Sequence, residues 1–176
     1  MNHSTVTRTA SAAIAAAAIA ILLSLAGCNI SGHAYKVAGD SMSPMLHPGD
    51  LIFADLSKNA RTNLHDGEVI LLHHNDAIVI KRILAMPGET ISGDFRKVYR
   101  NGKLLDEPYL APPSTTELPW MISFPPRTLG ASEIFVMGDN RDNSLDSRAA
   151  DYGPVKLSDV VGKYSWIYWH ATKPAK

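Results

Sequence analysis

The sequence predicts a mainly β protein built on an antiparallel sheet and preceded by an N-terminal hydrophobic helix. From residue 51 onward, short runs of β-branched and aliphatic residues alternate with turn signals. No convincing amphipathic helical repeat follows the N-terminal region. Residues 10–26 are almost wholly apolar, alanine-rich and then leucine-rich, which separates the N-terminus from the rest. We therefore expect an N-terminal segment over 1–32 and a β domain over 33–176.

Length and composition agree with one small domain. The chain has 176 residues, of which 45% are hydrophobic, enough for one sizeable core and an appendage. Its formal net charge is zero, and no basic stripe or interleaving of aromatic and basic residues is present. This pattern argues against a nucleic-acid partner.

The elements of the β domain follow from local patterns. Asn75-Asp76 predicts a tight turn, and Asn101-Gly102 is a strong signal for a two-residue hairpin turn. A short turn is expected within 157–161. The predicted strands, in chain order, are 51–54, 68–72, 77–84, 97–99, 104–105, 133–137 and 160–169.

The region 89–132 is predicted to be a short, proline-rich insertion. Five prolines between residues 111 and 130 exclude a helix or a central strand there, so we expect an extended excursion. Trp120, Met121 and Phe124 have two interpretations. They either dip into a membrane interface or pack the excursion onto the core.

A serine and a lysine are the candidate chemical groups. Ser41 lies in the segment G-D-S-M-S-P-M-L, and Lys81 follows the β-branched run I-V-I. A serine hydroxyl needs an unprotonated neighbour before it can attack an amide, and a buried lysine can be that neighbour because burial disfavours the ammonium form. Taken singly, each residue also fits a bland interpretation, with Ser41 in a turn and Lys81 reaching water from a strand end.

A third segment favours the chemical interpretation. Residues 137–148 read M-G-D-N-R-D-N-S-L-D-S-R, which sets two arginines among three aspartates. A solvated loop has no need of this mixture of charges. Carboxylate acceptors alternating with forked guanidinium donors predict a loop that is cross-linked internally and rigid.

These three segments, together with the hairpin Y-R-N-G-K-L-L-D-E-P-Y, resemble the type I signal peptidases, which are membrane-bound serine proteases. The resemblance extends from Val37 to Trp169 and implies the signal-peptidase and LexA-like antiparallel β fold with a small β insertion. It makes Ser41 the nucleophile and Lys81 the general base, with Ser144 orienting the lysine amine. The remaining implied roles are an Asp146–Arg148 supporting ion pair, Asp142 and Arg141 as structural loop members, and Met42 and Ile80 at the substrate cleft, although Met42 fits a core position equally well.

One position departs from part of this family. The Ser41 backbone N–H is the expected first oxyanion donor, and some members supply a second donor from a serine two residues earlier. This chain has Gly39 there. The second donor is therefore left open, with a water, another backbone N–H or a substrate-induced change as candidates.

The N-terminal segment has three interpretations. Residues 10–26 have the length of a short transmembrane anchor and the shape of a cleaved signal peptide. The sequence L-A-G-C also resembles a lipobox, in which Cys28, the chain's single cysteine, would be lipidated. All three place the β domain outside the cytoplasm. An anchor or a lipid would in addition hold it next to the lipid bilayer, on the extracytoplasmic side of a bacterial cytoplasmic membrane.

The resemblance implies an endopeptidase that cleaves N-terminal signal peptides from exported preproteins after small residues, at sites of the A-x-A type. We expect a monomer without a cofactor. No metal is expected either, because His73 and His74 are adjacent, hence on opposite faces of a strand, and no other His, Asp or Glu stands at ligand spacing from them. Two alternatives remain. One is a specialised Ser/Lys peptidase, of the conjugation-pilus maturation type or a LexA-like self-cleaving type. The other is a non-catalytic lipoprotein that keeps the β scaffold.

Overall fold

The computed structural model describes residues 5–7, 31–110 and 123–171. The predicted N-terminal helix over 10–26, Cys28, Trp120 and Met121 lie outside these ranges. Within the ranges, no helix is both long enough and apolar enough to cross a membrane.

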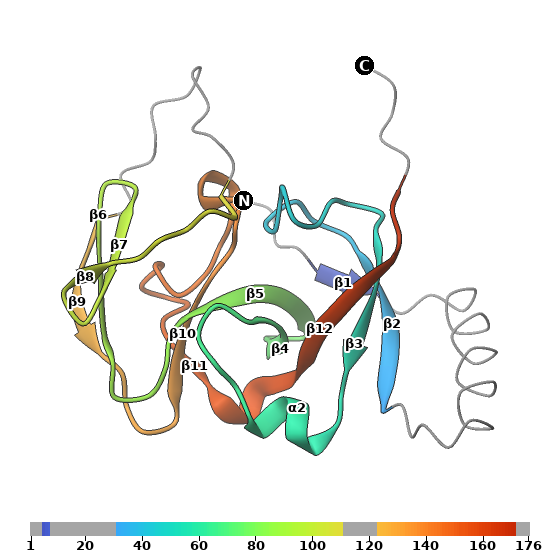
Figure 1. Cartoon of the computed structure of the whole chain (residues 1–176), viewed down its shortest axis with the longest axis horizontal. Helices are drawn as coiled ribbons and strands as arrows, with labels where there is room; N and C mark the ends of the chain where they lie inside the picture. The colour runs from blue at the N-terminus through green and yellow to red at the C-terminus, as the bar shows by residue number, and fades with distance from the viewer. Residues whose placement is uncertain (1–4, 8–30, 111–122, 172–176) are drawn as a thin grey trace, which may run out of the picture.

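The larger sheet has eight strands in the order β1-β2-β3-β12-β4-β5-β10-β11. Every pairing in it is antiparallel. Because β1 pairs with β5 as well as with β2, the first six strands form a closed ring (Figure 1). The strands are β1 (Thr5–Thr7), β2 (Gly32–Val37), β3 (Leu51–Asp55), β4 (Val69–His74), β5 (Ala77–Ala85), β10 (Glu133–Met137), β11 (Val155–Lys156) and β12 (Val160–Trp169).

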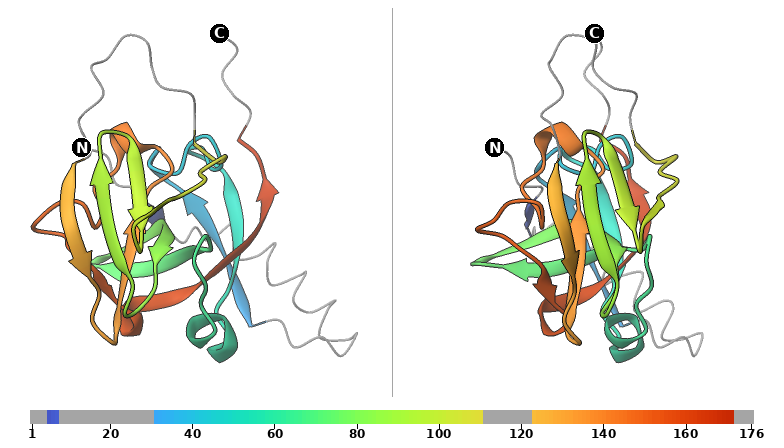
Figure 2. Two further views of the ribbon diagram at one scale, coloured as in Figure 1. Left: turned by 60° about the vertical axis from the view of Figure 1, so that its left-hand side comes forward. Right: turned by 90° about the vertical axis from the view of Figure 1, so that its left-hand side faces the viewer.

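A second antiparallel sheet has four strands in the order β8-β7-β6-β9 and lies beside the first sheet (Figure 2). Its strands are β6 (Thr90–Asp94), β7 (Lys97–Arg100), β8 (Lys103–Leu104) and β9 (Phe124–Thr128). Strand β9 carries Pro125 and Pro126, which cannot donate to a ladder, and it accordingly lies at the edge. Phe124 stacks on Phe135 at 5.1 Å between ring centroids, so for this residue the packing interpretation is the correct one.

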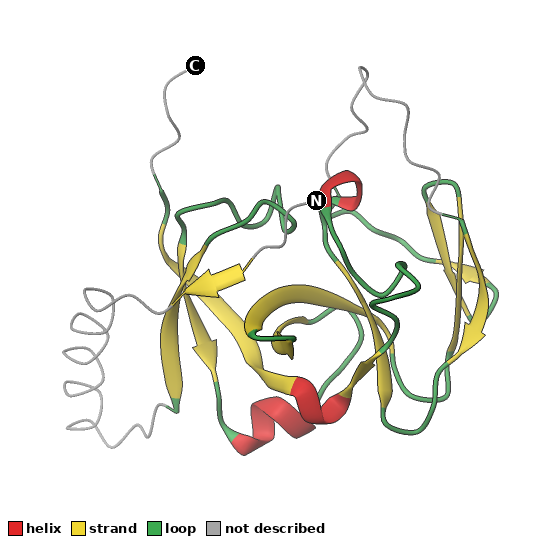
Figure 3. Ribbon diagram, turned by 180° about the vertical axis from the view of Figure 1, so that it is seen from behind, coloured by secondary structure: helices red, strands yellow, loops and turns green. Residues whose placement is uncertain are grey.

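Helical structure in the described residues is short (Figure 3). The α-helix α2 (Lys58–Thr62) begins after Ser57, whose hydroxyl accepts a hydrogen bond from the Ala60 N–H. Two 3-10 turns, η1 (Arg141–Asn143) and η2 (Leu157–Asp159), complete the set. Helix α2 was not predicted, although it does not contradict the expectation that no amphipathic helical repeat follows the N-terminal region. A five-residue helix that buries only one alanine leaves no apolar stripe to detect.

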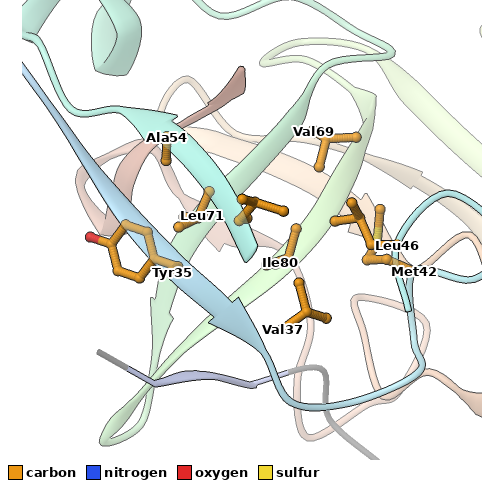
Figure 4. Packing of buried hydrophobic residues seen from close by; sticks show 9 residues of the cluster. Tyr35, Val37, Met42, Leu46, Ala54, Val69, Leu71 and Ile80 are labelled. Atoms are coloured by element: carbon orange, nitrogen blue, oxygen red, sulfur yellow. The ribbon is translucent and has the colours of Figure 1, made fainter. Parts of the chain in front are cut away.

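The core lies inside the ring of strands and between the larger sheet and the second sheet. One cluster of buried side chains joins β2, β3, β4 and β5 to the loop after β2 (Figure 4). A second cluster is built on β4, β5 and β10, and a third lies where β5 and β10 meet the second sheet. Strand β5 contributes to all three clusters, and its residues from Val79 to Ala85 are all buried.

The mainly β, antiparallel prediction is confirmed. Asn101 and Gly102 both have positive φ, 52° and 77°, as a two-residue hairpin turn of the predicted kind requires. The predicted strands agree with those observed to within a few residues, and β10 and β12 agree at both ends. Strands β1, β2, β6, β9 and β11 were not predicted.

Candidate active site

Ser41 lies in a tight turn that follows β2. The Ser43 N–H donates to Asp40 O at 3.1 Å, and the Leu46 N–H donates to Met42 O at 2.9 Å. The Ser43 hydroxyl also binds the Asp40 carboxylate. These local bonds fix the backbone on both sides of Ser41, which is buried in the described structure.

Lys81 lies in the middle of β5, next to the antiparallel partner strand β4. Its Nζ donates a hydrogen bond to Ser41 Oγ at 2.8 Å. The Lys81 residue is 0% exposed, and it is among the largest fully buried side chains of the protein. The structure therefore brings together the two residues that the sequence singled out first.

Burial lowers the pKa of Lys81 from 10.5 to about 8. Asp146 and Asp139 act in the opposite direction because their negative charges favour the ammonium form, while Arg148 adds to the lowering. Desolvation is the largest of these effects. A substantial fraction of this lysine is consequently uncharged just above neutral pH, where an exposed lysine is almost fully protonated.

Asp146 is the centre of the loop that faces the Ser41–Lys81 pair. Arg148 binds it with two hydrogen bonds, Nε to Oδ1 at 2.7 Å and Nη2 to Oδ2 at 2.9 Å. The Gly138 N–H and the Ser144 hydroxyl also donate to Asp146 Oδ2, at 3.0 and 2.7 Å. Burial by itself raises the pKa of Asp146, but the Arg148 guanidinium and these donors outweigh it, so the pKa is lowered and the carboxylate stays ionised.

Ser144 is held by Asp146 in this structure. Its hydroxyl proton is used in the bond to Asp146 Oδ2, which leaves its oxygen lone pairs as acceptors. The hydrogen bond described for Lys81 Nζ goes to Ser41. Among the described contacts, Ser144 and Lys81 share no direct hydrogen bond. Asp146 connects them, because it accepts from the Ser144 hydroxyl and its charge acts on the Lys81 amine.

Two residues of this loop, Asn140 and Gly138, lie against the turn that carries Ser41. The Asn140 N–H donates to Ser41 O at 3.0 Å, and Asn140 Nδ2 donates to Asp40 O and Oδ2 at 3.1 and 3.0 Å. A Cβ on Gly138 would lie 2.4 Å from both Ser41 O and Ser144 Oγ. Only glycine allows the two segments to approach this closely.

The other predicted residues lie at different depths. Gly39 is buried beside the turn, whereas Asp142 lies at the outer side of the loop and pairs with Arg96 at 2.9 Å. Met42 and Ile80 are both 0% exposed and belong to the first core cluster (Figure 4). Their predicted contact with substrate stays a prediction.

Sequence reasoning assigned no role to three residues that surround the site, Arg82, Asp139 and Glu107. Arg82, the residue after Lys81, binds Asp139 through Nε and Nη2 at 2.8 and 2.6 Å. Arg141 binds Glu107, which lies more than thirty residues earlier. The signal was present, because Asp139, Arg141 and Glu107 fall inside the quoted motifs and Arg82 directly follows Lys81, but the pairing of charges far apart in sequence could not be deduced.

The described residues contain no group of three or more His, Cys, Asp or Glu side chains that could hold a metal ion. His74 stacks on Tyr152 with 3.8 Å between ring centroids. The chemistry available at this site is that of a hydroxyl beside a partly neutral amine, which suits nucleophilic attack on a carbonyl, the reaction of serine hydrolases.

Comparison with known proteins narrows this class. Residues 9–169 match the family model described as "Signal peptidase, peptidase S26". The chain therefore belongs to the signal peptidase family, peptidase S26.

Individual relatives agree. Signal peptidase I S of Bacillus subtilis (strain 168) is 36% identical over 156 residues, which cover 86% of this chain and 84% of the relative. Signal peptidase IB of Staphylococcus aureus (strain Mu50 / ATCC 700699) is 29% identical over 148 residues, or 77% of this chain and 76% of the relative. The crystal structure of a signal peptidase I from Enterococcus faecalis V583 aligns with a TM-score of 0.51 at 31% identity, and the match covers 58% of this chain and 97% of that one.

Proposed function

We propose that this protein is a membrane-associated serine endopeptidase that removes N-terminal signal peptides from exported preproteins, with Ser41 as nucleophile and Lys81 as general base. The observation that carries the proposal is the 2.8 Å contact between Lys81 Nζ and Ser41 Oγ at full burial. A lysine pKa of about 8 supports it, because a general base works best when its pKa lies near the operating pH.

The reaction follows from these two groups. Neutral Lys81 accepts the Ser41 proton as Oγ attacks the scissile carbonyl carbon, and the resulting ammonium protonates the leaving amine. A water molecule activated by the same amine then hydrolyses the acyl-enzyme. The Ser41 N–H is the expected oxyanion donor, and because Gly39 carries no hydroxyl, a second donor has to come from another group.

The substrate segment before the cleavage site is proposed to bind as an added β-strand. Support comes from β1, whose backbone pairs with β2 at Val37 and with β5 at Ile78 and Val79. These two strands lead directly into Ser41 and Lys81. A signal peptide in the same slot would replace β1, with small residues such as alanine at the first and third positions before the cut.

The location is also part of the proposal. Residues 10–26, as an uncleaved anchor, or a lipid on Cys28 would hold the β domain at the extracytoplasmic face of the membrane, where signal-peptide cleavage sites emerge. Mass analysis of the N-terminus of the membrane-extracted protein distinguishes the two, because only lipidation removes residues before Cys28 and adds acyl mass.

The test is cleavage of a preprotein by the full chain in detergent. Wild type is expected to release the signal peptide after a small residue, as identified by mass spectrometry, whereas Ser41→Ala and Lys81→Met are not. Ser41→Ala removes only the hydroxyl and keeps the fold, so retained cleavage in this variant would refute the proposal. A wild type that binds the preprotein without cutting it would indicate a non-catalytic member of the family.

A further inference from the structure

The connection after β8 reaches back to the loop that faces Ser41. Glu107, which lies in this connection, binds Arg141 through two contacts, Oε1 with Nη2 at 2.5 Å and Oε2 with Nη1 at 3.2 Å. Their side chains are only 7% and 5% exposed. A fork-to-fork pair at this depth fixes orientation as well as charge.

Tyr109, two residues on, is part of the same contact. Its hydroxyl donates to Glu107 Oε1 at 2.7 Å, and its ring lies under the Arg82 guanidinium, with 4.0 Å from the guanidinium carbon to the ring centroid. Arg82 is next to Lys81 in β5 and also binds Asp139. The Glu107–Tyr109 pair thus holds two arginines, one beside Lys81 and one in the facing loop.

Two further atoms of Arg141, its Nε and its backbone carbonyl oxygen, bind residues close to the site. Its Nε donates to Gly138 O at 3.0 Å, and its own carbonyl accepts from Arg148 Nη1 at 3.0 Å. Gly138 packs so closely against Ser41 O that a Cβ would not fit between them. A shift of Gly138 would therefore displace the turn that carries Ser41. Arg148 in turn holds Asp146, the carboxylate that faces Lys81.

The charges of this group balance. Arg82 and Arg141 are matched by Asp139 and Glu107, and all four side chains are largely or wholly removed from water. A buried charge that loses its partner seeks a new one or moves toward water. Without Glu107, the Arg141 guanidinium would be an unpaired buried charge. It should then move toward water and lose its hydrogen bond to Gly138 O.

We propose that Glu107 and Tyr109 are positioning residues for the cleavage reaction, which hold the loop 138–148 in register with the Ser41–Lys81 pair through Arg141 and Arg82. The inference deepens the proposed function and rests on it, because its readout is turnover. Neither side chain is assigned a contact with substrate.

The experiment measures kcat and KM of the full chain in detergent on one preprotein, at a temperature well below thermal unfolding of every variant. Glu107→Gln keeps the shape and removes the charge. We expect kcat to fall by about a hundredfold, the cost of a displacement near 1 Å at a reacting group, with KM changed by less than threefold. Tyr109→Phe keeps the ring under Arg82 and removes one hydrogen bond, so kcat should fall by about fivefold.

Two controls separate positioning from general stability. Glu89→Gln also removes a carboxylate that pairs with an arginine of the second sheet, Arg100, but does not contact the loop, so its kcat should equal that of wild type. The double variant Glu107→Leu/Arg141→Met removes both buried charges and should recover thermal stability relative to Glu107→Gln. Its kcat should stay low because nothing then holds Gly138 O.

The acid limb of the pH profile gives a further readout. Glu107 is not among the charges that shift the pKa of Lys81, so the limb should stay in place in Glu107→Gln while kcat falls. Wild-type kcat in Glu107→Gln and Tyr109→Phe, or recovery of kcat with stability in the double variant, would overturn the inference alone. Cleavage by Ser41→Ala would instead overturn the proposed function.

Discussion

Lys81 Nζ lies 2.8 Å from Ser41 Oγ, and neither residue has any exposed surface. In the proposed mechanism only the neutral amine can accept the serine proton, so activity should depend on the pKa of about 8 that burial gives to Lys81. We expect kcat/KM to rise by about tenfold per pH unit below that value and to level off above it. A rate profile on one preprotein checks this, and a limb centred near pH 6 would indicate a histidine instead.

Asp146 should set where that limb lies. Its negative charge raises the pKa of Lys81, so Asp146→Asn, which also leaves the Arg148 charge uncompensated, should move the acid limb to lower pH. The maximal rate should fall as well, because one amide oxygen replaces a carboxylate that accepts from Gly138, Ser144 and Arg148. The same rate profile measures both effects. A limb at or above the wild-type position would contradict this electrostatic role.

Lys81→Met should give a protein that is inactive and more stable. The lysine pKa is about 8 in the folded state and 10.5 in the unfolded state, so between these values the unfolded chain binds more protons and wild-type stability rises with pH. Below about pH 8 the full cost of the buried ammonium is present, about 3 kcal/mol from a shift of 2.5 units.

The measurement for this variant is the free energy of unfolding in denaturant at pH 7 and at pH 10.5. Methionine has nearly the same length and no charge, so the variant should exceed wild type by about 3 kcal/mol at pH 7, and the difference should shrink at the higher pH. An equal or lower stability at pH 7 would mean that Lys81 is better solvated than its burial indicates.

Gly138→Ala should damage the site without adding or removing a polar group. The new Cβ would meet Ser41 O and Ser144 Oγ at 2.4 Å, so the turn that carries Ser41 and the facing loop have to separate. We expect a loss of stability of about 1–3 kcal/mol, typical of overpacking, and a fall in kcat of about a hundredfold. Gly130→Ala, where the nearest atom is the flexible end of Glu133 at 3.3 Å, is the control and should behave as wild type.

Asn140→Asp should weaken the link between the same two segments. It replaces an amide donor to Asp40 with a second carboxylate, so two like charges would face each other where two hydrogen bonds existed. We expect kcat to fall at neutral pH and to recover partly on acidification relative to wild type at the same pH. Asn143→Asp adds the same charge three residues further on and serves as the control; an equal effect of both changes would exclude a specific role for the Asn140–Asp40 contact.

The strands that could be predicted are those whose pattern is local. Asn101-Gly102 specifies its own backbone angles, and the β-branched run from Ile78 to Ile80 carries the signal of a buried strand without reference to any neighbour. Strand β6 could not be recognised, because T-I-S-G-D has one large apolar residue and becomes a strand only by pairing with β7 and β9.

In the candidate site, too, residues in local motifs could be predicted and contacts between distant segments could not. Ser41 and Lys81 could be found because each lies in a short motif with its own chemistry. The contacts of Arg141 with Glu107 and of Asn140 with Asp40 join segments separated by 34 and 100 residues, and no local pattern records them. Their detection needed the fold, because any of the chain's 17 acidic residues is a reasonable partner for an arginine until distance decides.

Strands β6 and β9 lie side by side at Thr90 and Thr128, whose hydroxyls are 2.8 Å apart, so the second sheet leaves and rejoins the larger one at neighbouring points. Such an attachment tolerates insertions and deletions during evolution, since the path between its ends can lengthen or shorten without moving the larger sheet. The hairpin tip at Asn101-Gly102 has this freedom. Under the proposed positioning role, the segment that carries Glu107 and Tyr109 lacks this freedom, which would set a lower limit on how short the second sheet and its connections can become in an active homologue.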